Sequence, residues 1–416
     1  MNKPKLLWLS DSPLTTTGFA GQTHFLLNNL VERGWEVHLV AHNYVGQRLL
    51  PGGFNMADGT TSKYFLYGAG REPYARDVVK HLIKTLRPEI FGVLLDTFML
   101  MDSGWYIRQD FSPAKLAFWF PSDGGNGMPV SCEALLARLQ LPVAMARYGQ
   151  KQVKDYYGIN TDYIPHAVDH TKYIRFSDEK REQLKKAWGL SGKFVFGSVY
   201  RNQQRKFADR MFKAFARFSR GKDDVVLLCH TDPNDVASYF NTMKMIQRLK
   251  LENKVVFTGM NFYDTFTYEK MLEVYNLIDC FTLSTSGEGF GVPIIEAMSC
   301  EIPVVMPSYT TGDELVRHHN SGYVAKLIES EDVDFFEMNA VEYDNTVGLM
   351  GSLPGGWDVD RGFVSIKDLA DKYELIYSDK EKARELGKNG RKAVLENYTW
   401  QVVSDKWHKA LSRLLE

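Results

Sequence analysis

The chain has 416 residues, of which 44% are hydrophobic and 24% are charged, and its formal net charge is -1. This composition is that of a globular protein, and the length predicts two domains rather than one core. The balanced charge excludes a global attraction to nucleic acid or anionic lipid, so any such contact needs a local patch.

The cysteines and the N-terminal sequence indicate the cellular compartment of the protein. The four cysteines have neither a Cys-x-x-Cys pair nor the spacing of zinc ligands, which predicts buried, reduced thiols and a cytoplasmic protein. They are Cys132, Cys229, Cys280 and Cys300. The apolar run 6–9 is too short for a signal peptide or a transmembrane helix and is typical of a first strand.

Strand and helix patterns alternate through the first part of the chain. Strands are predicted at 5–9, 36–41, 91–95, 116–120, 143–146 and 161–164, and helices at 25–33, 77–86 and 149–156. Such alternation predicts a parallel, doubly wound α/β sheet.

The alternation restarts after the loop 165–169. Strands are predicted at 194–199, 225–229, 255–257, 280–283 and 302–306, and helices at 208–218, 380–396 and 400–415. The sequence therefore predicts two Rossmann-like domains, 1–170 and 171–399. Ligands of such sheets bind at the carboxyl ends of the strands, so the cleft between the domains is the expected site.

One segment does not fit this alternation. Residues 328–360 contain nine acidic side chains and neither lysine nor arginine. Two interpretations stay open for this acidic segment: a solvated surface loop, or a surface that binds a partner or an acceptor.

The most informative motif follows the predicted strand 280–283. It runs through a loop with three glycines and a proline, with Glu288 at one end and Glu296 at the other. Pro293 suits the first turn of a helix, whose free backbone amides attract phosphate. Because two carboxylates suit the hydroxyls of a polyol, the motif predicts a nucleotide-sugar site.

This pattern, Glu-x7-Glu with Gly-Phe-Gly-x-Pro inside and Ala297-Met298 after it, resembles the donor signature of the retaining family-4 glycosyltransferases. The resemblance implies the GT-B fold, in which two Rossmann-like domains face a cleft. It also implies that the last helix, 400–416, crosses back onto the first domain. Glu301 is a departure, because these enzymes usually carry glycine at that position.

The resemblance also implies roles for the residues of the motif. Glu288 is expected to contact hydroxyls of the donor sugar, and Glu296 the ribose of the nucleotide. The backbone amides of Gly289, Phe290 and Gly291 are expected to hold the sugar and the diphosphate.

A basic loop follows the predicted strand 194–199. Arg201 and Lys206 match an Arg-x4-Lys pair that neutralises the departing nucleoside diphosphate in the resembling family. Cations fixed beside a leaving phosphate stabilise the transition state more than the ground state. The register leaves Arg205 open as a member of the pair, and without the resemblance a basic loop is more often plain surface.

Two loops of the first domain are expected to complete the site. In the resembling family a glycine-containing loop between the first strand and its helix borders the donor diphosphate and the acceptor. Gly18 is the candidate for that contact, with a simple turn as the alternative. Asp123 is expected to bind a sugar hydroxyl or to receive the acceptor proton, and a capped turn is equally compatible. His166 departs from the family pattern and is interpreted as structural.

Together with these residues, the resemblance implies a retaining, metal-independent hexosyltransferase without a cofactor. Its donor is a nucleotide-diphosphate sugar, and its acceptor is a hydroxyl of an unidentified glycan, lipid or protein. The alternatives are a nucleotide-sugar epimerase on the same scaffold, or a non-catalytic protein that binds a glycan or a nucleotide-sugar. The Asp-x-Asp at 358–360 lies in the acidic segment, so no metal site is predicted.

The sequence contains few features that indicate partners other than the substrates. No nucleic acid is expected. Basic residues on the predicted helices 77–86 and 149–156 leave two interpretations open: peripheral contact with the inner face of the membrane, or ordinary solvated helix faces.

Overall fold

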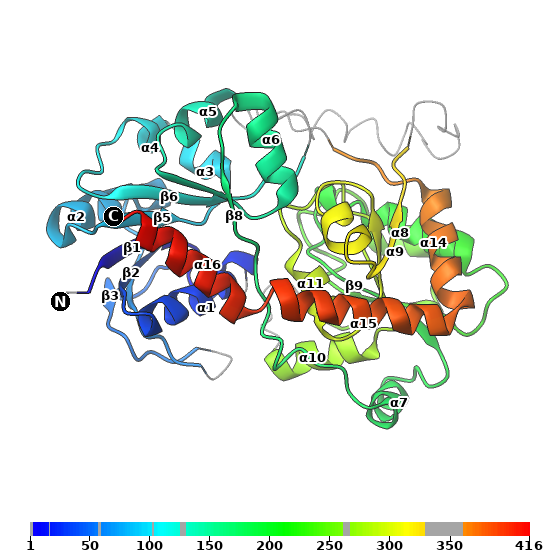
Figure 1. The fold of residues 1–416 in the computed structure, drawn as a ribbon. Coiled ribbons are helices and arrows are strands. Elements are labelled where there is room, and N and C mark those ends of the chain that lie inside the picture. Colours follow the sequence, from blue (N-terminus) through cyan, green and yellow to red (C-terminus); the bar gives the residue numbers. More distant parts are fainter. Residues whose placement is uncertain are drawn as a thin grey trace. The chain divides into compact units, whose positions relative to one another are not determined.

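The computed structural model describes residues 3–15, 17–56, 60–101, 104–124, 130–260, 267–328 and 361–416. The acidic segment, apart from Ile328, lies outside the described residues. The chain forms two compact units (Figure 1). Unit 1 comprises residues 1–122, 127–167 and 398–416, and unit 2 comprises residues 123–126 and 168–397.

Unit 1 is built on an eight-stranded sheet in the order β3-β4-β2-β1-β5-β6-β7-β8. Its strands are β1 (Lys5–Ser10), β2 (Glu36–Ala41), β3 (Leu49–Leu50), β4 (Phe65–Tyr67), β5 (Ile90–Val93), β6 (Lys115–Phe120), β7 (Leu141–Ala144) and β8 (Asp162–Tyr163). All pairs are parallel except the β3–β4 pair. The central strands are buried on both faces, as their continuous apolar sequences require.

The helices of unit 1 follow the strands in alternation. They are α1 (Gly18–Glu32), η1 (Pro73–Ala75), α2 (Arg76–Leu86), α3 (Thr97–Met101), α4 (Trp105–Arg108), α5 (Val130–Leu136), α6 (Arg147–Tyr157) and α16 (Trp400–Arg413). The first helix begins at Gly18 instead of the predicted residue 25, because Thr17 caps it by accepting a hydrogen bond from the amide of Ala20.

The C-terminal helix α16 belongs to unit 1, as the resemblance implied. The ring of Trp407 lies 5.4 Å from that of Trp8 on β1 and 5.3 Å from that of Trp119 on β6. Trp400, at the start of the helix, stacks on Phe25 of α1 with the ring centroids 5.3 Å apart. The C-terminal helix therefore packs in the same hydrophobic core as the first strand, β1.

Unit 2 contains a six-stranded parallel sheet in the order β11-β10-β9-β12-β13-β14. Its strands are β9 (Phe194–Val199), β10 (Val225–His230), β11 (Val255–Phe257), β12 (Cys280–Thr282), β13 (Val304–Pro307) and β14 (Gly322–Ala325). Its helices are α7 (Asp178–Ala187), η3 (Gln204–Lys206), α8 (Ala208–Phe218), α9 (Thr242–Arg248), α10 (Tyr268–Leu277), α11 (Val292–Ser299), η4 (Asp313–Arg317), α14 (Ile366–Ser378) and α15 (Lys380–Asn397).

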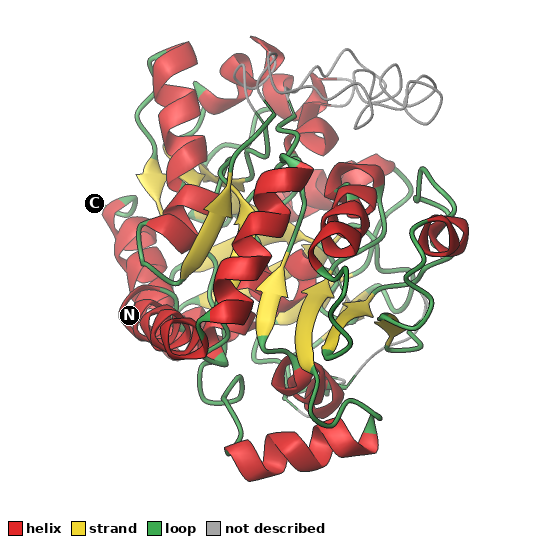
Figure 2. Ribbon diagram, turned by 90° about the vertical axis from the view of Figure 1, so that its right-hand side faces the viewer, coloured by secondary structure: helices red, strands yellow, loops and turns green. Residues whose placement is uncertain are grey.

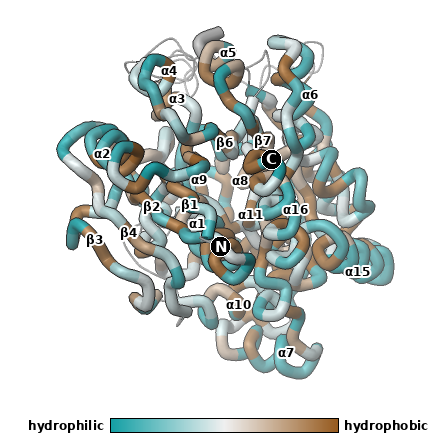
Figure 3. Tube along the Cα trace, turned by 60° about the vertical axis from the view of Figure 1, so that its left-hand side comes forward, coloured by the Kyte–Doolittle hydropathy of each residue, from teal (hydrophilic) through white to brown (hydrophobic). Residues whose placement is uncertain are grey.

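Helices cover the sheets of both units, and Figure 2 shows the strands enclosed between helices. In Figure 3 the outer helix α15 is mostly hydrophilic, in keeping with its exposed charged side chains. All four cysteines are free and buried, which confirms the prediction of buried thiols. No helix in the described part of the chain is long and apolar enough to span a bilayer.

Candidate functional site: a buried charge cluster on the Glu-x7-Glu loop

The Glu-x7-Glu motif joins the end of β12 to the start of α11. Gly291 precedes that helix with φ of +94°, a left-handed conformation that glycine adopts without strain. Pro293 lies in the first turn, as predicted. At Gly287 a Cβ atom would lie 1.8 Å from the carbonyl oxygen of Asp123, so this position accepts no side chain. The glycines therefore fix the path of the loop and allow a close backbone approach.

Glu288 is the centre of a buried charge cluster. The Lys206 ammonium donates a hydrogen bond to its Oε1, and Nη1 of Arg205 lies 3.3 Å from its Oε2. The backbone amide of Glu288 donates to Oγ1 of Thr310 at 3.0 Å. Only 4% of Glu288 is exposed, so its carboxylate is held by two cations away from bulk water.

The cluster also sets the protonation of its members. Burial alone would raise the pKa of Glu288, but Lys206 and Arg205 outweigh burial and lower that pKa to about 2. Burial and the Arg205 charge lower the pKa of Lys206 to about 8, although Glu288 acts in the opposite direction. Near neutral pH Glu288 is therefore an ionised hydrogen-bond acceptor, and Lys206 is still mostly protonated.

The second glutamate of the motif has a different environment. Glu296 lies on α11, and the hydroxyl of Tyr275 on α10 donates to its Oε2 at 2.5 Å. Burial raises the pKa of Glu296, while hydrogen bonds from Tyr275 and Tyr173 act to lower it. The two tyrosines fix the orientation of this carboxylate, and neither was singled out from the sequence.

Asp123 clusters with unit 2 although it follows a strand of unit 1. Nη1 of Arg361 lies 3.0 Å from its Oδ2 and also donates to its backbone carbonyl at 2.8 Å. The next residue, Gly362, donates its amide to the carbonyl of Ser286 at 3.0 Å. The chain that leaves the acidic segment therefore packs on the Glu-x7-Glu loop, and Arg361 is a member of the site that sequence reasoning missed.

Arg201, the other predicted cation, pairs with a different carboxylate. Nε of Arg201 donates to Oδ2 of Asp235 at 3.0 Å, and it is Arg205 that joins Lys206 at Glu288. Phe290 is buried with 2% of its surface exposed, whereas Gly289 and Gly291 are partly exposed. Gly18 is the first residue of α1 in unit 1, and a Cβ atom there would meet no neighbour within 4 Å.

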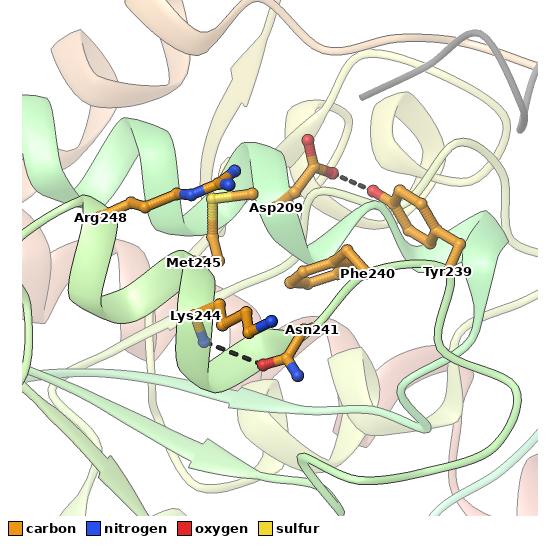
Figure 4. Close-up of a pocket in the computed structure, with 7 residues that line it drawn as sticks. All are labelled: Asp209, Tyr239, Phe240, Asn241, Lys244, Met245 and Arg248. Atoms are coloured by element: carbon orange, nitrogen blue, oxygen red, sulfur yellow. Dashed lines mark hydrogen bonds between the residues drawn. The ribbon is translucent and has the colours of Figure 1, made fainter. Parts of the chain in front are cut away.

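A separate cavity of about 260 Å³ lies between α8 and α9 of unit 2 (Figure 4). Tyr239 donates its hydroxyl to Asp209 on one side of it, and the amide of Lys244 donates to Oδ1 of Asn241 at 2.9 Å on the other. Phe240 lies between these two pairs in the view of Figure 4. The lining contains none of the residues predicted from the sequence, so this cavity is distinct from the Glu288 cluster.

Over the described ranges, no three His, Cys, Asp or Glu side chains gather in an arrangement suited to a metal ion. The charges that surround Glu288 are those of lysine and arginine side chains.

Comparison with known proteins finds a family match for the part of the chain that contains this site. Residues 180–333, which include the basic loop and the Glu-x7-Glu motif, match the family described as glycosyl transferases group 1. Mannosylfructose-phosphate synthase from Agrobacterium fabrum is 23% identical over 230 residues, which cover 54% of this chain and 48% of that protein. The chain spans about half the length of the curated relatives it matches.

Solved structures show the same fold over the whole chain. Sucrose-phosphate synthase from Thermosynechococcus elongatus is similar with a TM-score of 0.73 and 14% identity, covering 99% of both chains. HepE from Anabaena, solved in complex with UDP-glucose, is similar with a TM-score of 0.68 and 16% identity over 98% of this chain and 99% of that one. The α/β fold with two parallel sheets, predicted from the sequence, is thereby confirmed as GT-B.

Proposed function

We propose that the chain, whose residues 180–333 match the family described as glycosyl transferases group 1, is a retaining, metal-independent glycosyltransferase. It takes a hexose from a nucleoside-diphosphate sugar and transfers it to a hydroxyl of an acceptor. The observation that carries the proposal is the ionised Glu288 held between Lys206 and Arg205 on the Glu-x7-Glu loop.

The charge cluster supports the donor half of this reaction. An ionised carboxylate accepts hydrogen bonds from sugar hydroxyls, and a pKa of about 2 keeps Glu288 ionised across the physiological range. Lys206 and Arg205 supply the positive charge that the departing diphosphate requires. Glu296, oriented by Tyr275, supplies an acceptor for ribose hydroxyls.

The same cluster favours a mechanism without a covalent intermediate. The negative charge of Glu288 is already engaged by two cations, which makes this carboxylate a poor nucleophile. In the proposed step the acceptor oxygen bonds to the anomeric carbon on the face from which the diphosphate leaves. The bond from that carbon to the phosphate oxygen breaks, and the phosphate takes the proton of the acceptor hydroxyl. Cationic side chains supply the electrostatic stabilisation, so the step requires no metal.

Names of similar proteins guide the choice of the first substrates. HepE was solved with UDP-glucose, and two other similar proteins are named sucrose-phosphate synthase and mannosylfructose-phosphate synthase. UDP-glucose is therefore the first donor to test. The acceptor is a hydroxyl-bearing glycan, lipid or protein.

The test incubates the full chain with UDP-glucose, UDP-N-acetylglucosamine and GDP-mannose, each with and without EDTA. We expect one donor to release its nucleotide, slowly by hydrolysis and faster with an acceptor, at a rate that EDTA does not change. A changed nucleotide-sugar without nucleotide release would favour an epimerase instead. Tight donor binding without any release would favour a binding protein.

A further inference from the structure

Unit 1 contains an aspartate–histidine pair at the carboxyl end of its sheet. Asp11 follows β1 and His42 follows β2, two strands that pair in parallel with Ser10 opposite Ala41. Nε2 of His42 lies 2.8 Å from Oδ1 of Asp11. Both side chains are largely buried, with 14% of His42 and 11% of Asp11 exposed. This edge is where open α/β sheets bind their ligands.

The pair is anchored to the start of α1. The Thr17 hydroxyl donates a hydrogen bond to Oδ2 of Asp11, and its Oγ1 accepts from the amide of Ala20. Both oxygens of the Asp11 carboxylate are thus engaged, one by the histidine and one by the helix cap. The network fixes the imidazole to the loop that leads into α1 at Gly18.

Asp11 also determines which nitrogen of the His42 ring can accept a hydrogen bond from a ligand. A carboxylate only accepts hydrogen bonds, so the shared proton belongs to Nε2 of the imidazole. In the neutral ring Nδ1 then carries a lone pair, and among the described residues this nitrogen has no hydrogen-bond partner. A group that binds there must donate, as a hydroxyl does.

An aromatic side chain in an uncommon backbone conformation lies beside the pair. The ring centroid of Tyr74 is 6.0 Å from that of His42. Tyr74 and Ala75 are consecutive non-glycine residues in the left-handed region, with φ of 53° and 54°. Tyr106 holds this turn by donating its hydroxyl to the carbonyl of Tyr74 at 2.8 Å. Strained backbone of this kind concentrates at ligand sites.

We propose that His42, oriented by Asp11, binds a hydroxyl of a carbohydrate acceptor whose apolar ring face lies against Tyr74. A sugar fits because it presents hydroxyl donors at its edge and C–H groups on its face, which match an imidazole acceptor and an aromatic ring. The inference rests on the proposed function, because it assigns the acceptor of that transfer. Asp11 is a positioning residue here, and His42 is the residue that touches the acceptor.

Saturation-transfer NMR with D-glucose, D-mannose, D-fructose and N-acetyl-D-glucosamine tests the proposal on the full chain. At least one sugar should bind the wild type, and its affinity should fall about tenfold in His42→Phe and in Asp11→Asn. The control is His81→Phe, which changes an exposed histidine of α2 and should bind like the wild type. UDP affinity, measured by calorimetry, should be the same in all four proteins.

Two results would overturn the site. One is that no sugar binds the wild type, or that a sugar binds His42→Phe as tightly as it binds the wild type. The other is that His42→Phe weakens UDP as much as sugar, which would indicate a structural role. If no donor releases its nucleotide but sugar binding still depends on His42, the proposed transferase function fails while the sugar site stands.

Discussion

Lys206 donates a hydrogen bond to the carboxylate of Glu288, a residue 82 positions further along the chain. Lys206 follows β9 and Glu288 follows β12, and these two strands are hydrogen-bonded neighbours in the sheet. Parallel strands bring the loops at their carboxyl ends together, so the topology alone places the two motifs side by side. The pair joins the predicted phosphate-binding cation to the predicted sugar-binding carboxylate in one buried cluster.

The pKa of Lys206 predicts how nucleotide binding depends on pH. Burial lowers that pKa to about 8, and diphosphate binding requires the protonated ammonium. Raising the pH through 8 removes the proton, so UDP affinity should fall by about tenfold per pH unit above that value. The diphosphate itself is about nine-tenths ionised at pH 7 and more so at higher pH, since the second pKa of a phosphate is about 6. Calorimetric titrations between about pH 7 and pH 10 measure the slope.

Lys206→Arg is the matched variant for this dependence. A guanidinium remains charged over the whole range, so UDP affinity of the variant should be flat with pH. A flat profile for the wild type would show that Lys206 does not bind the diphosphate.

Removal of the Tyr275 hydroxyl is predicted to weaken the binding of the nucleotide. Tyr275→Phe removes the hydrogen bond to Glu296 but keeps the buried ring, so the fold is retained. Loss of one hydrogen bond to a charged group costs about 1.5 kcal/mol, or about tenfold in UDP affinity. Tyr377→Phe is the control, because Tyr377 makes an exposed tyrosine–carboxylate contact with Asp224 at 2.9 Å. Equal UDP affinity in the two variants would contradict the ribose role of Glu296.

The backbone conformation of Glu301 predicts that a glycine at this position would stabilise the protein. It occupies the position where the resembling family carries glycine, and it has φ of 57°, which an L-residue adopts with strain. Gly387 of α15 packs on its backbone, since a Cβ atom there would lie 2.1 Å from the Glu301 carbonyl oxygen. Glu301→Gly relieves the strain and should raise the free energy of unfolding by about 1 kcal/mol, or the melting temperature by about 2 °C.

Glu301→Ala separates backbone strain from charge. The variant removes the carboxylate but keeps a Cβ atom in the left-handed conformation, so its melting temperature should match that of the wild type. A gain in Glu301→Ala as large as that in Glu301→Gly would assign the effect to the charge instead.

Much of the fold was predictable because its elements are strongly periodic. The strand 194–199 and the helix 208–218 have the predicted bounds. The strand is a continuous buried run, and the helix is buried along one face, so both patterns are visible in the sequence. The start of α1 was missed because its first residues include two glycines and the polar Gln22. In the structure Gln22 is buried and bonds both backbone groups of Ala167, a tertiary contact that no local pattern reveals.

Several short elements of unit 1 were also missed. β3 has two residues and pairs antiparallel with β4, and α3 and α4 have five and four residues. Elements of this length are stabilised by tertiary packing, so the sequence carries little periodic signal for them.

The site was predictable where motif and topology coincide and not elsewhere. Glu288, Glu296 and Lys206 follow from the spacing of the motifs. The short turn η3 places Arg205 beside Lys206 at Glu288, while Arg201 pairs with Asp235, and the spacing of the motif does not reveal this difference. Arg361 contacts Asp123 across 238 positions of sequence, a contact that no spacing rule predicts.

Nucleotide release by Glu288→Gln tests the central claim most directly. The substitution keeps the size of the side chain but removes the charge that Lys206 and Arg205 share. We expect kcat/KM for the active donor to fall by about 100-fold or more. Glu269→Gln, which changes an exposed glutamate in the first turn of α10, is the control and should match the wild type. Full activity in Glu288→Gln would contradict the assignment of this cluster as the donor site.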